Sequence, residues 1–160
     1  MKNRIAIYPG SFDPITNGHM DIIQRGLEIF DQVIIAVARN SEKNSLFSVQ
    51  DRIELINRLI EDNPQLAVDT FDGLLVDYVV ASGASVILRG LRAVSDFEYE
   101  FQLAQMNRSI SQQVETLFMM TSTQNAYLSS SIVKEVASLG GDIDKFVPPL
   151  VAEELRKKFA

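Results

Sequence analysis

The hydrophobic positions along this chain follow two alternating periodicities. Short apolar runs rich in β-branched residues predict buried strands, and the stretches between them carry apolar residues at the three- and four-residue spacing of amphipathic helices. The predicted strands are Ile5–Tyr8, Val33–Ala38, Leu66–Phe71, Ser85–Leu88 and Glu115–Thr121. The predicted helices are Gly18–Phe30, a segment from the N-cap Ser48 to about Asp62, Leu74–Ser82, Asp96–Ile110, Ser129–Leu139 and Leu150–Phe159.

This alternation of strands and helices predicts an α/β fold. Right-handed crossovers connect strands that run parallel in one sheet, so the five runs are expected to form a parallel five-stranded sheet. The 160 residues contain no internal repeat, low-complexity segment or linker. A single domain spanning residues 1–160 is therefore expected.

Polar and glycine-containing segments follow four of the predicted strands. They are Tyr8–His19, Arg39–Lys43, Arg89–Arg92 and Thr121–Ser131. Because ligands of parallel sheets bind at the carboxyl ends of the strands, these four segments are expected to meet at one edge of the sheet. Their cations, hydroxyls and helix starts together predict a pocket for a polyphosphate.

The first of these segments ends at His19, the only histidine of the chain. Backbone N–H groups at a strand-to-helix junction, together with the helix dipole, favour a bound anion. His19 could donate its Nε2–H to a phosphate oxygen, or it could be a structural residue of a Gly- and Pro-rich turn. No Ser or Cys stands with it at a motif spacing, so a catalytic triad is not indicated.

Two arginines stand at the end of the fourth predicted strand. Arg89 follows the strand directly, and Gly90 permits a close approach of the backbone. Arginine at such a position is suited to bidentate recognition of phosphate. The alternative is that Arg89 and Arg92 form ion pairs with Asp96 or Glu98.

Two further groups carry the same ambiguity. Lys43 lies in the loop after the second strand, where a lysine is either solvated or placed to bind a phosphate. Ser129, Ser130 and Ser131 precede a predicted helix, where hydroxyl and N–H groups either cap the helix or bind a phosphate.

Composition narrows the classes of function. A net charge of −6 disfavours a non-specific nucleic-acid binder, which would usually be basic. The absence of cysteine and the single histidine exclude disulfides, thiolate metal sites and multi-histidine metal sites. Any metal would be a hard cation bound by oxygens. The N-terminus leads straight into a strand and no apolar run approaches the ~20 residues of a membrane span, so no membrane association and a cytoplasmic location are expected.

Three blocks of the sequence resemble a known family. Thr16–His19 resembles the (T/H)xGH signature of the nucleotidyltransferase superfamily related to class I aminoacyl-tRNA synthetases, and Leu128–Lys134 resembles its second, ISSTxxR-like signature. The string YPGSFDPITNGH, with Arg89–Arg108 and Ser129–Ala137, is similar to bacterial phosphopantetheine adenylyltransferases. The match runs essentially from end to end, and the three blocks are specific when taken together.

The resemblance implies a fold and a reaction. The fold is a Rossmann-like, doubly wound parallel sheet with helices on both faces, usually assembled as a homohexamer. The reaction joins ATP and 4′-phosphopantetheine to give dephospho-coenzyme A and pyrophosphate. Mg²⁺ would be bound mainly through ATP, with no metal site made by protein residues. Nucleic acids and membranes are not expected partners.

The resemblance also implies roles for individual residues. His19 would bind phosphates of ATP and stabilise the transition state, while Lys43 and Arg89 would hold the pantetheine phosphate. That phosphate is mostly dianionic at neutral pH, since its second pKa is about 6, so no general base is required. The implied pantetheine-binding residues are Ser11, Lys43, Leu75 and Arg89. The implied ATP-binding residues are Ser11, Phe12, His19, Gly90, Leu91, Arg92, Glu100, Asn125, Ala126, Tyr127, Leu128, Ser129, Ser130 and Ser131.

Some positions depart from the family pattern. Ser11 stands where threonine is common, which keeps the hydroxyl. Asn125 stands where the family often has an aromatic residue, which puts stacking at that position in doubt. Leu128 and Lys134 replace the isoleucine and arginine of the second signature, the latter a variation shared within the family.

Three other functions are compatible with parts of the sequence. One is a transferase of the same superfamily that acts on a nicotinamide or glycerol phosphate, against which the blocks RGLR and DFEYE argue. Another is a nucleotide-binding regulatory module, which would need neither Lys43 nor Arg89 to face a second phosphate. A tRNA-charging fragment is the third, and the chain lacks the basic bias expected of it.

Overall fold

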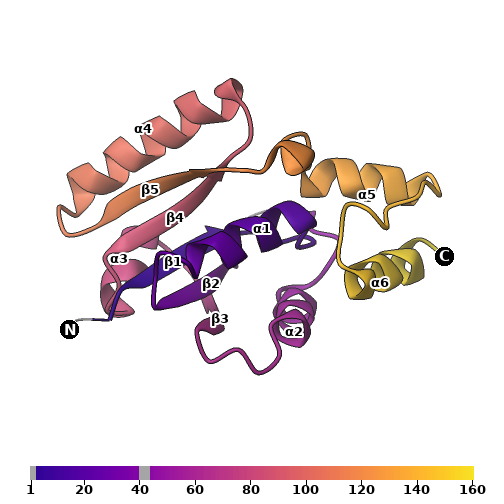
Figure 1. Ribbon diagram of the computed structural model, residues 1–160, viewed down its shortest axis with the longest axis horizontal. Helices are drawn as coiled ribbons and strands as arrows, with labels where there is room; N and C mark the ends of the chain where they lie inside the picture. Colours follow the sequence, from indigo (N-terminus) through magenta and orange to yellow (C-terminus); the bar gives the residue numbers. More distant parts are fainter. Residues whose placement is uncertain (1–2, 40–43) are drawn as a thin grey trace.

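A five-stranded parallel sheet forms the centre of the computed structural model, which describes residues 3–39 and 44–160 (Figure 1). The strands are β1 (Ile5–Gly10), β2 (Gln32–Ala38), β3 (Leu66–Phe71), β4 (Val86–Leu91) and β5 (Glu115–Met120). Their order across the sheet is β3-β2-β1-β4-β5, and all four neighbouring pairs are parallel. The winding direction therefore reverses between β1 and β4, which is where a doubly wound sheet opens a crevice for ligands.

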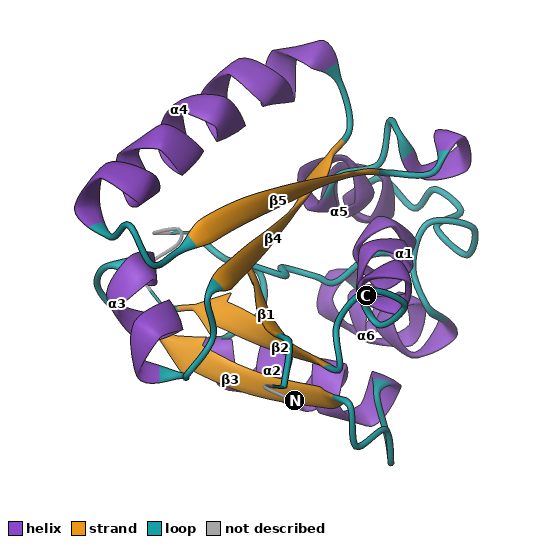
Figure 2. Ribbon diagram, turned by 60° about the vertical axis from the view of Figure 1, so that its left-hand side comes forward, coloured by secondary structure: helices purple, strands orange, loops and turns teal. Residues whose placement is uncertain are grey.

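Helices cover both faces of this sheet. They are α1 (Asn17–Gly26), α2 (Val49–Leu59), α3 (Leu75–Ala81), α4 (Val94–Ile110), α5 (Ser130–Ser138) and α6 (Pro149–Phe159), with a short 3₁₀ turn at Thr123–Asn125. Figure 2 shows α3 and α4 on one side of the sheet and α1, α5 and α6 on the other. The predicted Rossmann-like, doubly wound α/β fold is confirmed.

The alternation of side chains along the strands divides the core into two. Ala6 and Tyr8 of β1 belong to the larger core, which also holds apolar residues of α1, α2, α5 and α6. Ile7, between them, points to the opposite face and packs with Ile87 of β4 and Val76 and Val79 of α3. This is the period-two pattern of strands that are buried on both faces.

Helix α1 approaches the sheet closely at Gly26. A Cβ atom at this position would lie 2.9 Å from Cδ2 of Leu88 in β4, a distance that side chains do not tolerate. The other end of α1 is held by the backbone N–H of Asn17, which donates to the carbonyl of Phe146 at 2.9 Å. The helix is therefore located at both ends, and its first turn faces the carboxyl ends of β1 and β4.

Three predicted ends were wrong by three residues or more, and one of them is that of α2, which ends at Leu59 rather than at about Asp62. β4 does not end at Leu88 but continues to Leu91, because Arg89, Gly90 and Leu91 pair in register with residues of β5. Helix α1 ends at Gly26 rather than Phe30, and Ile29 and Phe30 donate their N–H groups to the Gly26 carbonyl in a terminal turn. Arg89 thus belongs to the strand itself, which restrains its backbone.

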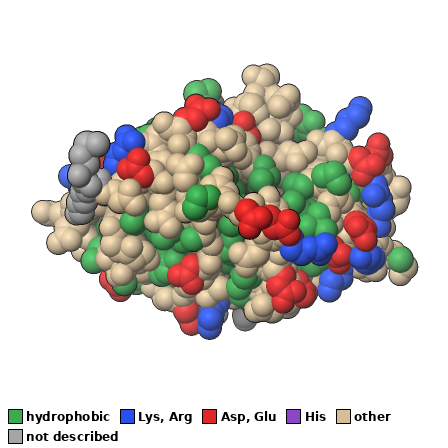
Figure 3. Space-filling model, turned by 60° about the horizontal axis from the view of Figure 1, so that its bottom comes forward, with side chains coloured by type: hydrophobic (Ala, Val, Ile, Leu, Met, Phe, Trp, Pro, Cys, Tyr) green, Lys and Arg blue, Asp and Glu red, His purple; other side chains and the backbone are tan. Residues whose placement is uncertain are grey.

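The surface of the described chain mixes charges. On the face drawn in Figure 3, basic side chains are scattered among acidic ones. Among residues 3–39 and 44–160, no helix combines the length and apolar character that crossing a membrane requires.

Candidate active site

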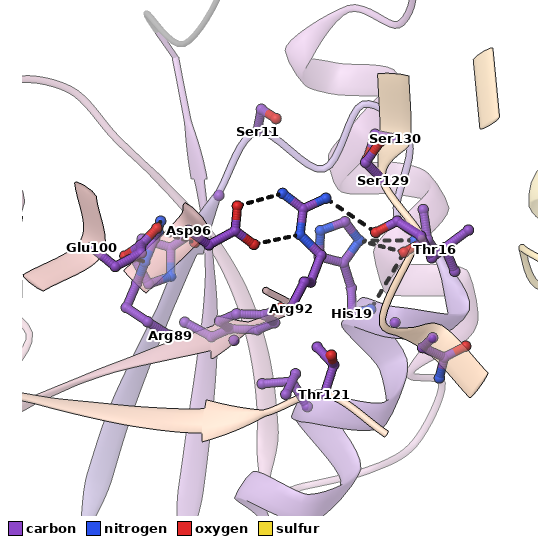
Figure 4. A pocket seen from close by; sticks show the side chains of 18 of the residues that line it. Ser11, Thr16, His19, Arg89, Arg92, Asp96, Glu100, Thr121, Ser129 and Ser130 are labelled. Carbon is purple, nitrogen blue, oxygen red and sulfur yellow. Dashed lines mark hydrogen bonds and ion pairs between the residues drawn. The ribbon is translucent and has the colours of Figure 1, made fainter. Parts of the chain in front are cut away.

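A cavity of about 550 Å³ opens at the carboxyl ends of β1 and β4, at the point where the strand order reverses (Figure 4). The start of α1, the first turns of α4 and the start of α5 complete its walls. The lining residues are Tyr8, Pro9, Gly10, Ser11, Thr16, Gly18, His19, Ile22, Arg89, Gly90, Arg92, Asp96, Tyr99, Glu100, Thr121, Asn125, Leu128, Ser129, Ser130 and Ser131. Three of the four predicted strand-end segments therefore meet there, while Lys43 of the remaining segment lies outside the described residues.

His19 takes part in the N-terminal cap of α1. The backbone N–H of Thr16 donates to Nδ1 of His19 at 2.9 Å, and the backbone N–H of His19 donates to the Thr16 hydroxyl at 3.4 Å. Because Nδ1 accepts a hydrogen bond, the neutral ring carries its proton on Nε2. Both readings of His19 are therefore compatible, since the cap that makes it structural also orients an Nε2–H donor at the cavity.

The surroundings of His19 keep its ring neutral. Burial disfavours the imidazolium form, and the nearby guanidinium groups of Arg92 and Arg89 add to this effect, so the pKa of His19 falls to about 4. Phe12 packs edge-on against the ring with the ring centres 5.0 Å apart. In the ligand-free protein at neutral pH, His19 is thus a hydrogen-bond donor of fixed tautomer.

Each of the two arginines of the cavity is held by one carboxylate and one backbone carbonyl. Nε and Nη2 of Arg89 donate to the carboxylate of Glu100, and Nη1 donates to the carbonyl of Pro9 at 3.2 Å. Nε and Nη2 of Arg92 donate to the carboxylate of Asp96, and Nη1 donates to the carbonyl of Leu128 at 3.1 Å. A guanidinium has five N–H groups, so each arginine has two left for a ligand.

The ion pairs considered as an alternative are therefore present in part. Arg92 pairs with Asp96, as that alternative anticipated, but the partner of Arg89 is Glu100 rather than Asp96 or Glu98. Asp96 and Glu100 are four residues apart on α4 and so face the same side of the helix. Figure 4 shows both pairs pointing into one space beside His19.

The start of α5 provides both capping and open donors. Ser129 is the N-cap, and its hydroxyl accepts the N–H of Ile132 at 3.2 Å. The hydroxyl of Ser130 donates to the carbonyl of Pro14 at 2.8 Å, which ties α5 to the loop after β1. Ser131 also lines the cavity, so the free N–H groups of this first turn face the space where an anion would lie.

Other predicted site residues lie elsewhere. The side chain of Phe12 is buried beneath the cavity, while Leu91, Ala126 and Tyr127 are absent from its lining. Leu75 lines a separate small cavity of about 40 Å³ together with Leu103, Ala104, Asn107 and both members of the Arg89–Glu100 pair. That ion pair thus separates the two cavities.

Several residues that line or support the cavity were not predicted from the sequence. Tyr99 lines the cavity from α4, and the spacing of Asp96, Tyr99 and Glu100 by three and four residues was the available signal. Two buried residues carried no signal because their partners are distant in sequence: Asp13, which lies in the loop after β1 and accepts the N–H of Phe47, and Arg52, which donates to the carbonyl of Ser11 in the same loop.

The donor set of the cavity is that of an anion site. Among the residues that the structure describes, no three His, Asp or Glu side chains are grouped as a metal site would require. The two carboxylates that line the cavity, Asp96 and Glu100, are each bound to an arginine. The groups left to meet a ligand include the Nε2–H of His19, guanidinium N–H groups, the N-terminus of α5 and the hydroxyl of Ser11.

Comparison with known proteins places the chain in a family. Residues 7–136 match the family described as cytidylyltransferase-like. Phosphopantetheine adenylyltransferase of Geobacter metallireducens is 69% identical over 160 residues, which cover 100% of this chain and 98% of the relative. This chain belongs to the phosphopantetheine adenylyltransferase family. The protein of that name from Geobacter sulfurreducens is 68% identical over the same 160 residues and the same shares of both chains.

A solved structure supports the fold alone. Plasmodium falciparum nicotinic acid mononucleotide adenylyltransferase in complex with NaAD superposes with a TM-score of 0.71 at 17% identity, covering 98% of this chain and 96% of that one. The family membership inferred from the three sequence blocks is confirmed by the relatives, and the doubly wound architecture by this structure.

Proposed function

We propose that this protein transfers the AMP group of ATP to 4′-phosphopantetheine, giving dephospho-coenzyme A and pyrophosphate. Its family membership and the names of its relatives support this reaction. The observation that carries the proposal is the cavity at the switch point of the sheet. There a neutral histidine with a fixed Nε2–H, two guanidinium groups and a helix N-terminus converge within about 550 Å³.

In the proposed reaction an oxygen of the acceptor phosphate attacks the α-phosphorus of ATP. A new P–O bond forms as the bond from that phosphorus to the bridging oxygen of pyrophosphate breaks, so the electron pair leaves with pyrophosphate. The acceptor phosphate has its second pKa near ~6 and is its own nucleophile at neutral pH, which makes a base unnecessary. A histidine whose pKa is about 4 and whose ring has a fixed tautomer is suited instead to donating a hydrogen bond from Nε2.

The two sides of the cavity suit the two substrates. His19, Arg92 and the first turn of α5 would bind the triphosphate and the departing pyrophosphate. Arg89, with Lys43, would hold the acceptor phosphate in line. The small cavity beyond the Arg89–Glu100 pair, with a volume of about 40 Å³, combines apolar side chains with the amide of Asn107, a lining that suits one amide group of the pantetheine arm but not its whole length.

Mg²⁺ would reach this site with the nucleotide. The cavity's carboxylates, Asp96 and Glu100, are both engaged by arginines, so the donor atoms that fit the ion are phosphate oxygens. When bound, the ion would neutralise part of the phosphate charge, while the residues of the chain orient and separate the two anions.

Helix α4 is proposed to lie at a contact between subunits of a homohexamer. Phe97, Tyr99, Phe101, Met106 and Ile110 are all exposed large hydrophobic side chains of this one helix. Exposed apolar surface in this amount usually marks an association surface. We further place the assembly in the cytoplasm, where ATP is at hand; sedimentation analysis of the native protein would test the subunit number.

The reaction is tested by measuring pyrophosphate release from ATP and Mg²⁺ with a panel of phosphate acceptors. Release with 4′-phosphopantetheine, and none with nicotinate mononucleotide or glycerol phosphate, is the expected result. Release with one of the other acceptors would reassign the substrate. Binding of ATP without release for any acceptor would favour the regulatory module.

A further inference from the structure

The loop between β1 and α1 is anchored by a buried carboxylate. Asp13 is only 1% exposed, and Oδ1 accepts the backbone N–H of Phe47 at 2.8 Å. Oδ2 accepts the backbone N–H of Leu46 at 2.9 Å and Nζ of Lys134 at 2.8 Å. One side chain thus joins three segments that are far apart in sequence: the loop after β1, the chain leading into α2, and α5.

We propose that Asp13 and Lys134 are positioning residues for adenylyl transfer, which hold the loop after β1 and the segment before α2 in register with the start of α5. The inference rests on the proposed function, because the start of α5 and this loop are the parts assigned to ATP and to both phosphates. Neither Asp13 nor Lys134 lines the cavity, so the pair acts through its neighbours.

Those neighbours do line the cavity. Ser11 lies two residues before Asp13 and Thr16 three residues after it. Ser130 and Ser131 lie four and three residues before Lys134, on the same side of α5. A shift of the ammonium group relative to the carboxylate would therefore move donors on both sides of the bound phosphates.

Two further contacts support the same loop. Nη1 of the buried Arg52 donates to the carbonyl of Ser11 at 2.7 Å, and the hydroxyl of Ser130 donates to the carbonyl of Pro14 at 2.8 Å. Together with Asp13, these contacts hold the loop from α2 on one side and from α5 on the other. The Asp13–Lys134 pair is the one bond in this set that is an ion pair, so it depends on charge as well as on position.

The charged state of Asp13 is maintained by its partners. Burial raises the pKa of this carboxyl, but the hydrogen bonds from Lys134 and from the N–H groups of Phe47 and Leu46 outweigh that effect and hold the pKa below its ordinary value. Removal of one partner would leave an unpaired buried charge, whereas removal of both charges leaves none. This difference allows positioning to be separated from folding.

Four variants of the full chain make this separation: Lys134→Met, Asp13→Asn, the double variant, and Lys134→Arg. Lys157→Met is the matched control, because Lys157 is an exposed lysine that pairs only with Glu153 and Glu154 on its own helix among the described contacts. The readouts are Tm, kcat and KM for both substrates, and amide hydrogen exchange at Leu46 and Phe47.

Each single charge removal is expected to lower both Tm and kcat, with kcat falling roughly 10- to 100-fold, the scale associated with small misplacements of reacting groups. The double variant is expected to regain part of the lost Tm without regaining kcat, and its two mutations to be non-additive in kcat. Lys134→Arg should restore most of the activity, and Lys157→Met should match the wild type. Exchange at Leu46 and Phe47 should accelerate in every variant that lacks the pair.

Two results would overturn the inference. A double variant with both Tm and kcat of the wild type would show that the pair is dispensable for adenylyl transfer. An increase in the KM for ATP alone, additive with Asp13→Asn, would make Lys134 a phosphate ligand. If the wild type released no pyrophosphate, the proposed function would fail, yet the exchange rates would still decide whether Lys134 holds the segment before α2: unchanged rates in Lys134→Met would reject the positioning role.

Discussion

Two walls of the cavity present cationic or donor groups in different ways. The signature wall, residues 11–19, holds its groups through backbone atoms and buried side chains, as in the cap between Thr16 and His19. The arginine wall, residues 89–100, holds its two guanidinium groups through carboxylates of α4. A phosphate that binds at the signature wall meets hydrogen-bond donors that are not paired with an anion in the cavity. At the arginine wall it meets guanidinium groups that are already paired with carboxylates.

This contrast explains how an acidic chain can bind two polyanions. Donors that need no rearrangement give the largest stabilisation of a developing charge, which favours the signature wall as the place where the transferred group reacts. The arginines are oriented by Asp96 and Glu100 and still offer free N–H groups, which suits them to binding and alignment. We therefore expect mutations at the signature wall to affect mainly the rate of the reaction and mutations at the arginine wall to affect mainly binding.

The largest effect is expected for His19→Ala. Loss of one prepositioned donor to a developing oxyanion costs roughly 10²- to 10³-fold in kcat. The KM for ATP should change much less, because the arginines and α5 still bind the phosphates. Steady-state kinetics of pyrophosphate release would measure both, and His19→Asn, which retains an N–H donor, should recover part of kcat. A kcat near that of the wild type would remove His19 from the mechanism.

A smaller effect, confined to one substrate, is expected for Glu100→Gln. The neutral amide cannot hold the Arg89 guanidinium with two charge-assisted hydrogen bonds. The guanidinium would therefore lose the fixed orientation in which it is proposed to bind the acceptor phosphate. We expect kcat/KM for phosphopantetheine to fall about tenfold, equivalent to about 1.4 kcal/mol, with the ATP affinity little changed.

Glu115→Gln is the control for this variant, because Glu115 pairs with Arg108 on the surface, away from the cavity lining. An equal loss for both substrates in Glu100→Gln would contradict the separation of the two walls and would favour the predicted contact of Glu100 with ATP.

A change in stability is expected for Gly26→Ala. The added methyl group would meet Leu88 at 2.9 Å, and overpacking of this kind costs about 1–3 kcal/mol, reduced by the better helix propensity of alanine. Gly18→Ala in the same helix has its nearest heavy atom at 3.5 Å and should keep or increase Tm. Thermal unfolding of both variants tests whether α1 is held against β4; equal Tm values would show that it is not.

Near neutral pH, the smallest effect is a pH dependence. The folded pKa of His19, about 4, lies below its unfolded value near 6.5, so the native state binds fewer protons between these values. The stability from this group is complete above pH 6.5 and declines as pH falls toward 4, by no more than about 1.4 kcal/mol per unit. The contribution of Asp13, whose pKa is lowered, is lost only below its unfolded value of about 3.9.

Because the chain has one histidine, its ring resonances can be followed by NMR without ambiguity. The free protein should show a neutral, Nε2-protonated ring at pH 6. Addition of ATP and Mg²⁺ should raise the pKa, since phosphate oxygens favour the imidazolium. Titration near pH 6.5 in the free protein would mean that the ring is more solvated than the structure shows.

Local patterns in the sequence determined much of this architecture. Each of the five strands was predicted within three residues of its observed limits, because short runs of β-branched apolar residues favour buried strands over other structures. The N-cap at Ser48, which forms a capping box with Asp51, also follows from residues that are close in sequence. The position of His19 in the first turn of α1 follows in the same way, since it lies at a strand-to-helix junction.

Which groups meet in the cavity depends on how the elements pack. The extension of β4 to Leu91 depended on pairing with β5, and the choice of Glu100 by Arg89 depended on how α4 lies across the sheet. The partners of Asp13 come from residues 46–47 and 134, and no local rule connects positions so far apart. Local sequence patterns were therefore enough to predict the elements and the segments that carry the chemistry. The packing of those elements determined which walls they form, because contacts between distant segments exist only once register and crossover have been set.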